Sequence, residues 1–183
     1  GRKHSGKSTA ANFAQDYFAS MGSDAKIFSF AYPIKRMREA FLQSAGISSS
    51  DDKEEPITAL PCSPTNRQLE QTIGTEWGRE IISPDIWLQH MDVRLVATRH
   101  DVAIIDDVRF PNELSWCRRN GFNLIWIERP VSDVDNHKSE QALASERPRS
   151  NEPLIHNDSD IVTLRSRVCH AIDAIESYSI EEG

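Results

Sequence analysis

Hydrophobic residues recur at helical spacing in some parts of the chain and form short unbroken runs in others. A repeat of about 3.6 residues predicts an amphipathic helix, whereas an apolar run of roughly four to eight residues predicts a buried strand. These patterns predict helices over residues 8–19, 34–44, 66–82 and 83–100, a helix closing at 120–121 and another running to 175, with strands over 25–30, 101–107, 122–128 and 154–156. Strands alternating with helices indicate an α/β protein with a parallel sheet.

Turn-forming residues mark the predicted boundaries. Gly22 and Asn120-Gly121 stand where helices stop, and Pro33 and Ser83-Pro84 stand where helices begin. Asn157-Asp158-Ser159 has the composition of an N-cap for the last helix. Residues 46–65 hold three prolines and a charged run with little periodicity, which predicts a mobile loop or a small flap.

Two glycines interrupt the helical pattern of residues 66–82, at Gly74 and Gly78. Glycine inside a helix costs about 1 kcal/mol relative to alanine. We therefore expect that backbone or a ligand approaches the helix closely at these two positions.

The first nine residues, Gly1-Arg2-Lys3-His4-Ser5-Gly6-Lys7-Ser8-Thr9, match the pattern G-x-x-x-x-G-K-[ST] of a phosphate-binding P-loop. In such a loop the lysine reaches the outer phosphates and the serine hydroxyl binds Mg²⁺. The helix predicted from residue 8 fits, because a helix N-terminus favours phosphate. A P-loop follows a buried strand, so we expect that the natural protein has a few residues before Gly1 and that they form a strand at the centre of the sheet.

The apolar run Val102–Ile105 ends in two carboxylates, Asp106 and Asp107. A buried parallel strand delivers such an acid to the edge of the sheet where ligands bind. Together with a P-loop, this predicts a strand whose acid lies near Mg²⁺, and the two acids stay equal candidates. Without a P-loop, a surface turn would explain them.

Basic residues recur at the edges of the predicted elements. Lys35, Arg36 and Arg38 open one helix, where a phosphate ligand would explain them, although a solvated helix face is the commoner meaning. Further cations stand at Arg67, Arg79 and Arg109, which is what two phosphate-bearing substrates brought together would require. Residues 129–153 are rich in charge and are either a lid-like segment or a solvated loop.

Composition narrows the class of protein. A length of 183 residues suits one domain, and a net charge of -7 argues against nucleic acid as the main partner. No apolar run approaches the roughly 18 residues of a membrane span, and no signal peptide is visible. Three widely spaced cysteines fit a reducing cytoplasm better than a disulfide framework. An N-K-x-D guanine-recognition loop does not occur.

Several motifs occur together in a characteristic order: Arg67-Gln-Leu-(x)3-Ile-Gly74-Thr75-Glu76, Trp87, Ile104-Ile105-Asp106-Asp107-Val108-Arg109-Phe110-Pro111-Asn112-Glu113, Glu128-Arg129-Pro130, His137-Lys138-Ser139-Glu140 and Asn157-Asp158-Ser159. With the P-loop, this order resembles the phage-type deoxynucleoside monophosphate kinases. The resemblance implies a three-layer P-loop kinase fold, with a central parallel sheet flanked by helices. It also implies transfer of phosphate from ATP to a dNMP with Mg²⁺, in the cytoplasm of the host cell if the chain is phage-encoded.

The resemblance also implies roles for individual residues. The ATP site would comprise His4, Ser5, Gly6, Lys7, Ser8 and Thr9, with Lys3 and His4 between donor and acceptor. The dNMP site, mainly within residues 31–100, would comprise Lys3, Ile34, Lys35, Arg67, Gly74, Thr75, Trp87, Asp107, Arg109 and Glu113, to which we add Arg79 from its charge and position. The catalytic residues would be Lys3, Lys7, Arg67 and Arg109, and the metal ligands Ser8 with Asp106 or Asp107.

Two departures from the family pattern affect these expectations. His4 stands where a cation is common, and imidazole is mostly neutral at pH 7. Tyr32 stands where a small or acidic residue often precedes the proline, which leaves the preferred acceptor base open. Two other functions fit part of the pattern: a kinase of the dephospho-coenzyme A type, or a nucleotide-binding regulatory protein without turnover. Two apolar helix faces would allow a homodimer.

Overall fold

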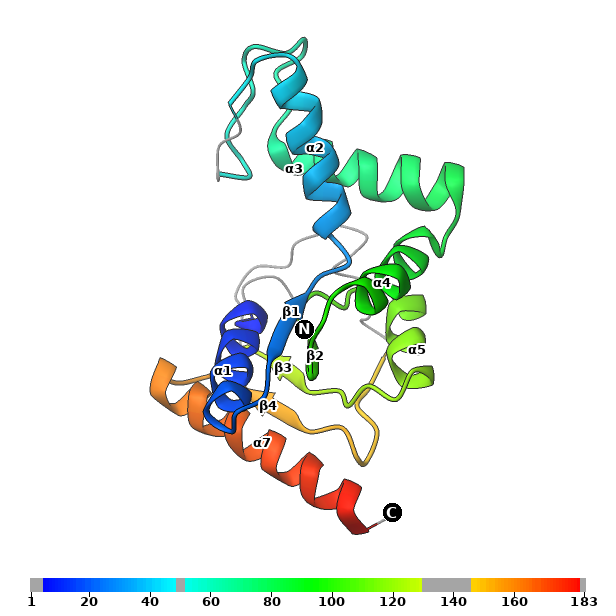
Figure 1. Cartoon of the computed structure of the whole chain (residues 1–183). Coiled ribbons are helices and arrows are strands. Elements are labelled where there is room, and N and C mark those ends of the chain that lie inside the picture. The colour runs from blue at the N-terminus through cyan, green and yellow to red at the C-terminus, as the bar shows by residue number, and fades with distance from the viewer. Residues whose placement is uncertain (1–4, 49–51, 130–145, 182–183) are drawn as a thin grey trace. The chain divides into compact units, whose positions relative to one another are not determined.

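The computed structural model of the chain describes residues 5–48, 52–129 and 146–181 (Figure 1). Lys3 and His4 lie outside the described residues, as do His137, Lys138 and most of the predicted lid-like segment. The chain divides into two compact units, one formed by Gly1–Ser29 with Arg99–Gly183 and the other by Phe30–Thr98. The second unit takes in nearly all of the region, about residues 31–100, in which we expect the acceptor site.

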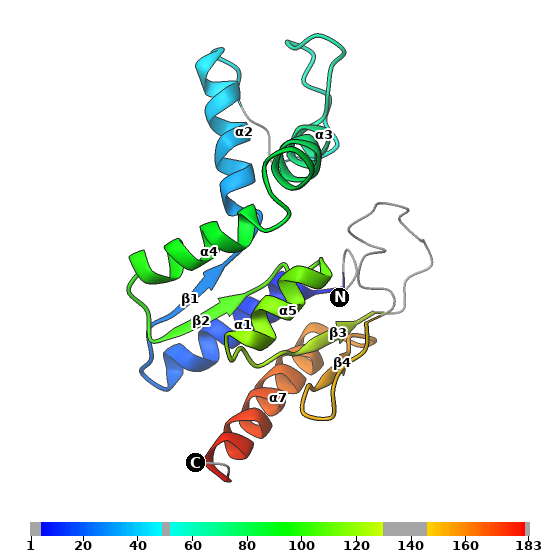
Figure 2. The ribbon, with the colours of Figure 1, turned by 90° about the vertical axis from the view of Figure 1, so that its right-hand side faces the viewer.

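The described part of the first unit holds four strands in two parallel pairs, and the alternating pattern predicts parallel pairing. β1 (Ala25–Phe28) pairs with β2 (Val102–Ile105), and β3 (Trp126–Glu128) pairs with β4 (Leu154–His156). Figures 1 and 2 show these strands between helices α1 (Lys7–Ser20) and α7 (Ile161–Glu181) on one face and α5 (Pro111–Arg119) on the other. The described residues thus form a mixed α/β unit with two small parallel sheets rather than one continuous sheet.

The core of the first unit lies where α1 and α7 cover β3 and β4. Small residues of α1 allow the two helices to approach closely, and larger aliphatic residues of α7 fill the space between them. The buried cluster consists of Ala10, Ala14, Ile127, Ile155, Leu164, Val168, Ala171 and Ile172. Burial of apolar surface of this kind contributes roughly 25 cal/mol for each Å² removed from water.

Several boundaries in the first unit differ from the sequence predictions: β1 ends at Phe28, not at residue 30, and β2 covers Val102–Ile105, not residues 101–107. β3 begins at Trp126, not at residue 122, because its pairing with the chain around β4 starts where the Trp126 amide donates to the Pro153 carbonyl at 2.8 Å. The last helix is capped by Asp160, whose carboxylate accepts the Thr163 amide at 2.7 Å. The prediction of residues 157–159 as the cap was therefore wrong, and the Asn157 side chain is used elsewhere.

The second unit is helical. It contains α2 (Tyr32–Ser44), α3 (Asn66–Gln71), the π-helix η1 (Thr72–Ile82) and α4 (Ile86–Ala97). A capping box opens α3, in which the Thr65 hydroxyl accepts the Gln68 amide at 3.1 Å and the Gln68 side chain accepts the Thr65 amide at 2.8 Å. The helix predicted from Ser83 begins instead at Ile86, because Ser83 is extended and Asp85 takes the N-cap position.

The sequence pattern predicts one helix over residues 66–82. In the structure this segment is α3 followed by η1, so it is not an α-helix throughout. In a π-helix each amide bonds to the carbonyl five residues earlier, and the Ser83 amide bonds in this way to the Gly78 carbonyl at 2.9 Å. Residues five apart therefore become neighbours. Arg79 accordingly reaches back one turn, and its Nη1 donates to the Gly74 carbonyl at 2.8 Å.

The two glycines of η1 are explained by side chains that pack against them. A Cβ at Gly78 would lie 2.4 Å from Cζ2 of Trp87, and a Cβ at Gly74 would lie 2.9 Å from Cδ1 of Ile34. The expected close approach is thus present in the second unit, and it is made by Trp87 and Ile34.

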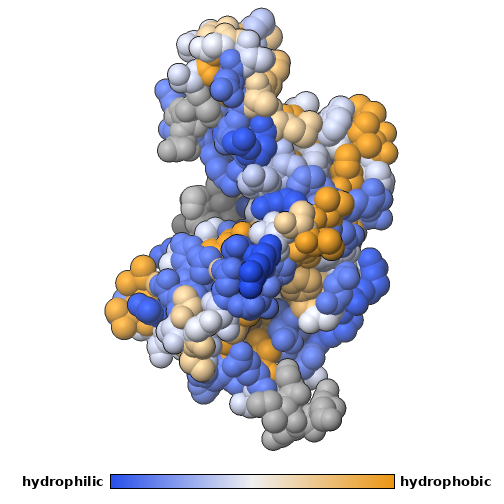
Figure 3. Space-filling model, viewed as in Figure 1, coloured by the Kyte–Doolittle hydropathy of each residue, from blue (hydrophilic) through white to orange (hydrophobic). Residues whose placement is uncertain are grey.

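Hydrophobic side chains also reach the surface of the second unit (Figure 3). They include Ile81 and Ile82 at the end of η1 and Val93 and Val96 on α4. A homodimer built on such faces stays a prediction. Within the described residues, none of the helices combines the length and the apolar character needed to cross a bilayer.

Candidate functional site

The glycine-rich loop is held against the start of α7. Gly6 has a φ of 95°, in the left-handed region, and a Cβ at this position would lie 2.6 Å from Nδ2 of Asn157. The same Nδ2 donates to the carbonyl of the buried Ser5 at 2.9 Å. Glycine is therefore required at position 6 both by the backbone conformation and by the approach of Asn157.

The loop leads directly into the N-terminus of α1. The Gly6 carbonyl accepts the first helical hydrogen bond, from Ala10 at 2.9 Å, and Lys7 Nζ lies 3.3 Å from the Ser5 hydroxyl. The first turn of α1 holds no acidic residue, and its N-cap residue, Gly6, supplies no side-chain hydrogen bond to it. The N-terminus of a helix that begins next to a lysine and without acidic side chains suits a phosphate group.

The two carboxylates after β2 have different partners. The hydroxyl of Ser8, the second residue of α1, donates to Asp106 Oδ2 at 2.8 Å. Asp107 Oδ2 instead accepts the Ser29 hydroxyl at 2.6 Å. The structure thus separates two acids that the sequence left equal, and Asp106 is the one beside the glycine-rich loop.

The pair Ser8 and Asp106 offers hydroxyl and carboxylate oxygens, which are the donors that Mg²⁺ prefers. No group of three or more His, Cys, Asp or Glu side chains able to hold a metal occurs among the described residues. This fits Mg²⁺ all the same, because that ion commonly takes one or two protein ligands and completes its shell with water and substrate phosphates.

Glu113 is buried at the N-terminus of α5 and organises the turn that follows β2. Its Oε2 accepts the backbone amides of Arg109 at 2.7 Å and Phe110 at 3.0 Å. Glu113 therefore fixes the backbone at Arg109. A contact of either side chain with an acceptor nucleotide stays a prediction.

Four residues predicted to bind the acceptor meet in the second unit, around the Gly74 carbonyl. This oxygen accepts Nε1 of the buried Trp87 at 2.8 Å and Nη1 of Arg79 at 2.8 Å, and the buried Ile34 packs against Gly74. Thr75 follows directly and is half-buried. These contacts bind the start of α2, η1 and α4 to one another, so the cluster shapes this part of the chain whether or not a ligand touches it.

The predicted acceptor arginine, Arg67, forms an ion pair within the second unit. Its Nε donates to Glu54 Oε1, from the segment before α3. Two of the three cations that open α2 are also paired, Arg36 with Glu39 at 2.9 Å and Arg38 with Glu70 at 2.6 Å. In the second of these pairs Arg38 is buried and Glu70 is half-buried, so the solvated-face interpretation is wrong for Arg38.

Three site residues were missed at the sequence level. Asn157 entered as a predicted helix cap and as part of a family motif but with no role in the site, and nothing in its spacing indicates a partner 152 positions away. Ser29 has no local signal at all. Glu54 stands in an acidic run that the sequence pattern describes only as a loop.

A glycine-rich loop at the start of a helix, with an acid from the end of a parallel strand beside its serine, defines an α/β protein compatible with the P-loop kinase fold. The family model of deoxynucleotide monophosphate kinase matches residues 43–168, more than half of the chain. The chain belongs to the deoxynucleotide monophosphate kinase family.

Two curated relatives agree with this assignment. The deoxynucleoside-5'-monophosphate kinase of Escherichia phage T5 is 31% identical over 139 residues, which cover 71% of this chain and 54% of the phage protein. The chain thus spans about half the length of that relative. A protein of Acanthamoeba polyphaga mimivirus, named "Putative deoxynucleotide monophosphate kinase", is 30% identical over 189 residues, which cover 94% of this chain and 93% of the mimivirus protein.

Proposed function

We propose that the chain transfers the γ-phosphate of ATP to a deoxynucleoside monophosphate, giving ADP and a deoxynucleoside diphosphate. The observation that carries this proposal, beside the family, is the left-handed Gly6 at the start of α1, where the Ser8 hydroxyl donates to Asp106 Oδ2 at 2.8 Å. Phosphoryl transfer needs positioned cations and a metal more than covalent chemistry from the protein, and this loop supplies the positions.

The donor side of the reaction uses the loop and the start of α1. Ser5, Gly6, Lys7, Ser8 and Thr9 bind the ATP phosphates through amides and hydroxyls, and Lys7 carries positive charge to the outer phosphates. Ser8 and Asp106 hold Mg²⁺, which neutralises charge on the phosphates when it is bound. Asp107 belongs instead to the acceptor side, and we propose no metal contact for it. Lys3 and His4 keep the roles predicted from the sequence.

The acceptor side uses Lys35, Arg67 and Arg109 as cations toward the dNMP phosphate. Ile34, Gly74, Thr75, Arg79 and Trp87 form the frame of the nucleotide site, with Gly74 held by the hydrogen bonds from Arg79 and Trp87. Glu113 positions Arg109 through its backbone amide. The acceptor phosphate is already ionised at neutral pH, so no general base is required.

The finer fold assignment is part of this proposal: a three-layer P-loop kinase fold with one central parallel sheet flanked by helices. It is supported by the parallel direction of both strand pairs and by α1 and α5 on opposite faces (Figure 2). The same family relation favours small-molecule substrates, with no nucleic acid or membrane partner, and action in the cytoplasm.

A coupled assay of ADP release tests the function, with each of the four dNMPs and their ribose counterparts as acceptor. We expect turnover with at least one dNMP and loss of nearly all of it in Lys7→Ala. Unchanged turnover in that variant refutes the proposal. ATP binding that no dNMP affects, without turnover, would favour the regulatory alternative, and transfer to a hydroxyl acceptor would favour a kinase of the dephospho-coenzyme A type.

Arg67→Ala tests the acceptor side. A hydrogen bond to a charged group contributes about 1.5–3 kcal/mol, which corresponds to a rise of about 10- to 150-fold in the dNMP KM. The ATP KM should change far less. Arg36→Ala is the matched control, because Arg36 is an exposed arginine paired with Glu39, and both KM values should stay as they are. Equal changes in the two KM values of Arg67→Ala would remove Arg67 from the acceptor site.

A further inference from the structure

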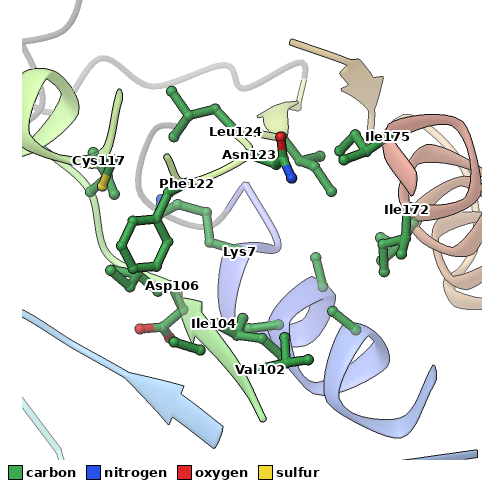
Figure 4. Close-up of a pocket in the computed structure, with 18 of the residues that line it drawn as sticks. Lys7, Val102, Ile104, Asp106, Cys117, Phe122, Asn123, Leu124, Ile172 and Ile175 are labelled. Atoms are coloured by element: carbon green, nitrogen blue, oxygen red, sulfur yellow. The ribbon is translucent and has the colours of Figure 1, made fainter. Parts of the chain in front are cut away.

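A choice between acceptor bases requires polar groups, because the bases differ in the carbonyl and amino groups along their edges. The cavity of about 450 Å³ in the first unit is lined mainly by apolar side chains, with Lys7 and Asp106 beside them (Figure 4). Both of these polar residues already serve the ATP phosphates and Mg²⁺ in the proposed function. Apolar walls do not distinguish a carbonyl from an amino group, so they leave base selection to polar side chains elsewhere.

Two side chains suited to this task are stacked in the second unit, Tyr32 and Arg94. Tyr32 is the first residue of α2, and Arg94 lies in the second half of α4. Figure 2 shows the start of α2 beside α4. The guanidinium carbon of Arg94 lies over the Tyr32 ring, 3.8 Å from its centre. The ring thus orients a planar group that is attached to a long and flexible side chain.

The stack adjoins the frame of the acceptor site. Arg94 follows Trp87 by seven residues, or about two helical turns, so both side chains leave α4 on the same side. The Trp87 indole donates to the Gly74 carbonyl at 2.8 Å, and Ile34, the second residue after Tyr32, packs against the same glycine. The start of α2 and one side of α4 therefore carry both the frame and the stack.

Both stacked groups are open to a ligand. Tyr32 is 44% exposed and Arg94 is half-buried. A cation–π contact at such a site contributes little to stability by itself. Burial, with a smaller effect from Arg94, lowers the pKa of His90, which lies one turn earlier on α4. The imidazole is therefore neutral at pH 7, and Arg94 supplies the positive charge at this place.

A guanidinium group has hydrogen-bond donors only, arranged as a planar fork. Guanine presents two acceptors that match this fork, O6 and N7, whereas adenine has an amino donor in place of O6. We infer that Arg94, oriented by Tyr32, binds the O6 and N7 edge of the acceptor base and so selects dGMP over dAMP. The inference rests on the proposed function, because it names the base of the same acceptor. Tyr32 is a positioning residue, since it acts through Arg94.

Steady-state kinetics with the two purine acceptors tests the inference, because dGMP and dAMP share one ring system and differ at this edge. A bidentate contact between arginine and guanine corresponds to about 5- to 150-fold discrimination, so kcat/KM should be higher for dGMP by such a factor. Arg94→Met removes the fork and keeps a long side chain. It should bring the two kcat/KM values together by lowering that of dGMP, with the ATP KM unchanged. An unchanged ratio, or equal losses for dGMP and dAMP, overturns the inference.

Three further variants separate the fork from charge and from general packing. Arg36→Met is the matched control, because Arg36 is an exposed arginine of α2 paired with Glu39, and the ratio of dGMP to dAMP should not change. Tyr32→Leu removes the ring and should lower the ratio. Tyr32→Phe should keep the ratio, because the guanidinium stacks on the ring and not on the hydroxyl. Equal losses of the ratio in Tyr32→Leu and Tyr32→Phe would refute the positioning role of the ring.

Base analogues test the same contact in the unaltered protein, so this result does not depend on the folding of a variant. The acceptor dIMP keeps O6 and N7 and lacks only the 2-amino group, so its kcat/KM should be close to that of dGMP. The 7-deaza analogue of dGMP lacks N7, and its kcat/KM should fall toward that of dAMP. A 7-deaza analogue as good as dGMP, or dIMP as poor as dAMP, overturns the inference.

Calorimetric titration with dGMP and dAMP distinguishes this inference from the proposed function. Tighter binding of dGMP that is lost in Arg94→Met, without any turnover, would defeat the proposed function alone. Turnover with equal affinities for the two purine nucleotides would defeat the role of Arg94 alone. Binding of neither nucleotide would defeat both.

Discussion

The sharpest structural test concerns the two glycines of η1. Gly78→Ala places a methyl group where Cζ2 of Trp87 lies 2.4 Å away and the Ile73 carbonyl oxygen lies 2.9 Å away. Gly74→Ala places one 2.9 Å from Cδ1 of Ile34, the flexible end of a side chain, with the next neighbour at 3.8 Å. Both changes remove a helix-interior glycine, so they share the same gain in helix propensity and differ in the collision.

The expected magnitudes follow from these distances. Overpacking a well-filled site costs about 1–3 kcal/mol, and replacing glycine by alanine in a helix returns up to about 1 kcal/mol. Gly78→Ala should therefore destabilise the protein by about 1–2 kcal/mol, and Gly74→Ala should stay within about 0.5 kcal/mol of the parent, because Ile34 can rotate. In a chain of this size the Gly78→Ala loss corresponds to a fall of about 2–8 °C in Tm.

Denaturant unfolding and calorimetry of the two variants provide the measurement. Adding Trp87→Leu to both the parent and Gly78→Ala completes a double-mutant cycle. Gly78→Ala should destabilise the Trp87→Leu protein less than it destabilises the parent, since most of the collision is with the indole ring. Should Gly78→Ala be as stable as Gly74→Ala, the packing of Trp87 on η1 would be refuted.

Three further predictions concern charge and the loop. Glu54→Gln frees Arg67 from a largely exposed ion pair worth about 0.2–1 kcal/mol, so steady-state kinetics should show the dNMP KM falling by about 1.4- to 5-fold with the ATP KM unchanged; a higher dNMP KM would contradict this. Asn157→Ala removes the hydrogen bond to the Ser5 carbonyl, and titration should show weaker ATP binding with Tm lowered by a few degrees at most; unaltered ATP affinity would separate Asn157 from the loop. Glu152 is buried, which raises the pKa of its carboxyl, but hydrogen bonds from Arg118, the Trp126 indole and the Arg149 amide lower the pKa by more. The ionised Glu152 carboxylate therefore contributes to the stability of the folded state above its unfolded-state pKa, and this stability is lost as pH falls through the lower folded-state pKa. Glu152→Gln should lower the free energy of unfolding by about 3 kcal/mol at pH 7 and by progressively less in acid. A loss of stability that does not change with pH would contradict this role of Glu152.

The sequence by itself determined the elements whose signals are local. The helix after the glycine-rich loop, the strand before Asp106 and Asp107, and the end of α5 at Asn120-Gly121 depend on neighbours within a few residues, so these elements were predicted correctly. The order of motifs was also sufficient to identify the family, because that order can be read from the sequence without the tertiary structure. Strand pairing in parallel followed from the alternation of strands and helices.

Only the tertiary structure decided which residues meet. Asp106 and Asp107 have the same chemistry and adjacent positions, and they differ because the pleat of the backbone turns one toward Ser8 and the other toward Ser29. Asn157 reaches Ser5 across nearly the whole sequence. The two glycines of η1 interrupt the helical pattern in the sequence, but only the structure shows that Trp87 and Ile34 pack against them. The hydrophobic periodicity of a segment indicates which of its faces is buried. Contacts between residues far apart in sequence depend on how the whole unit packs.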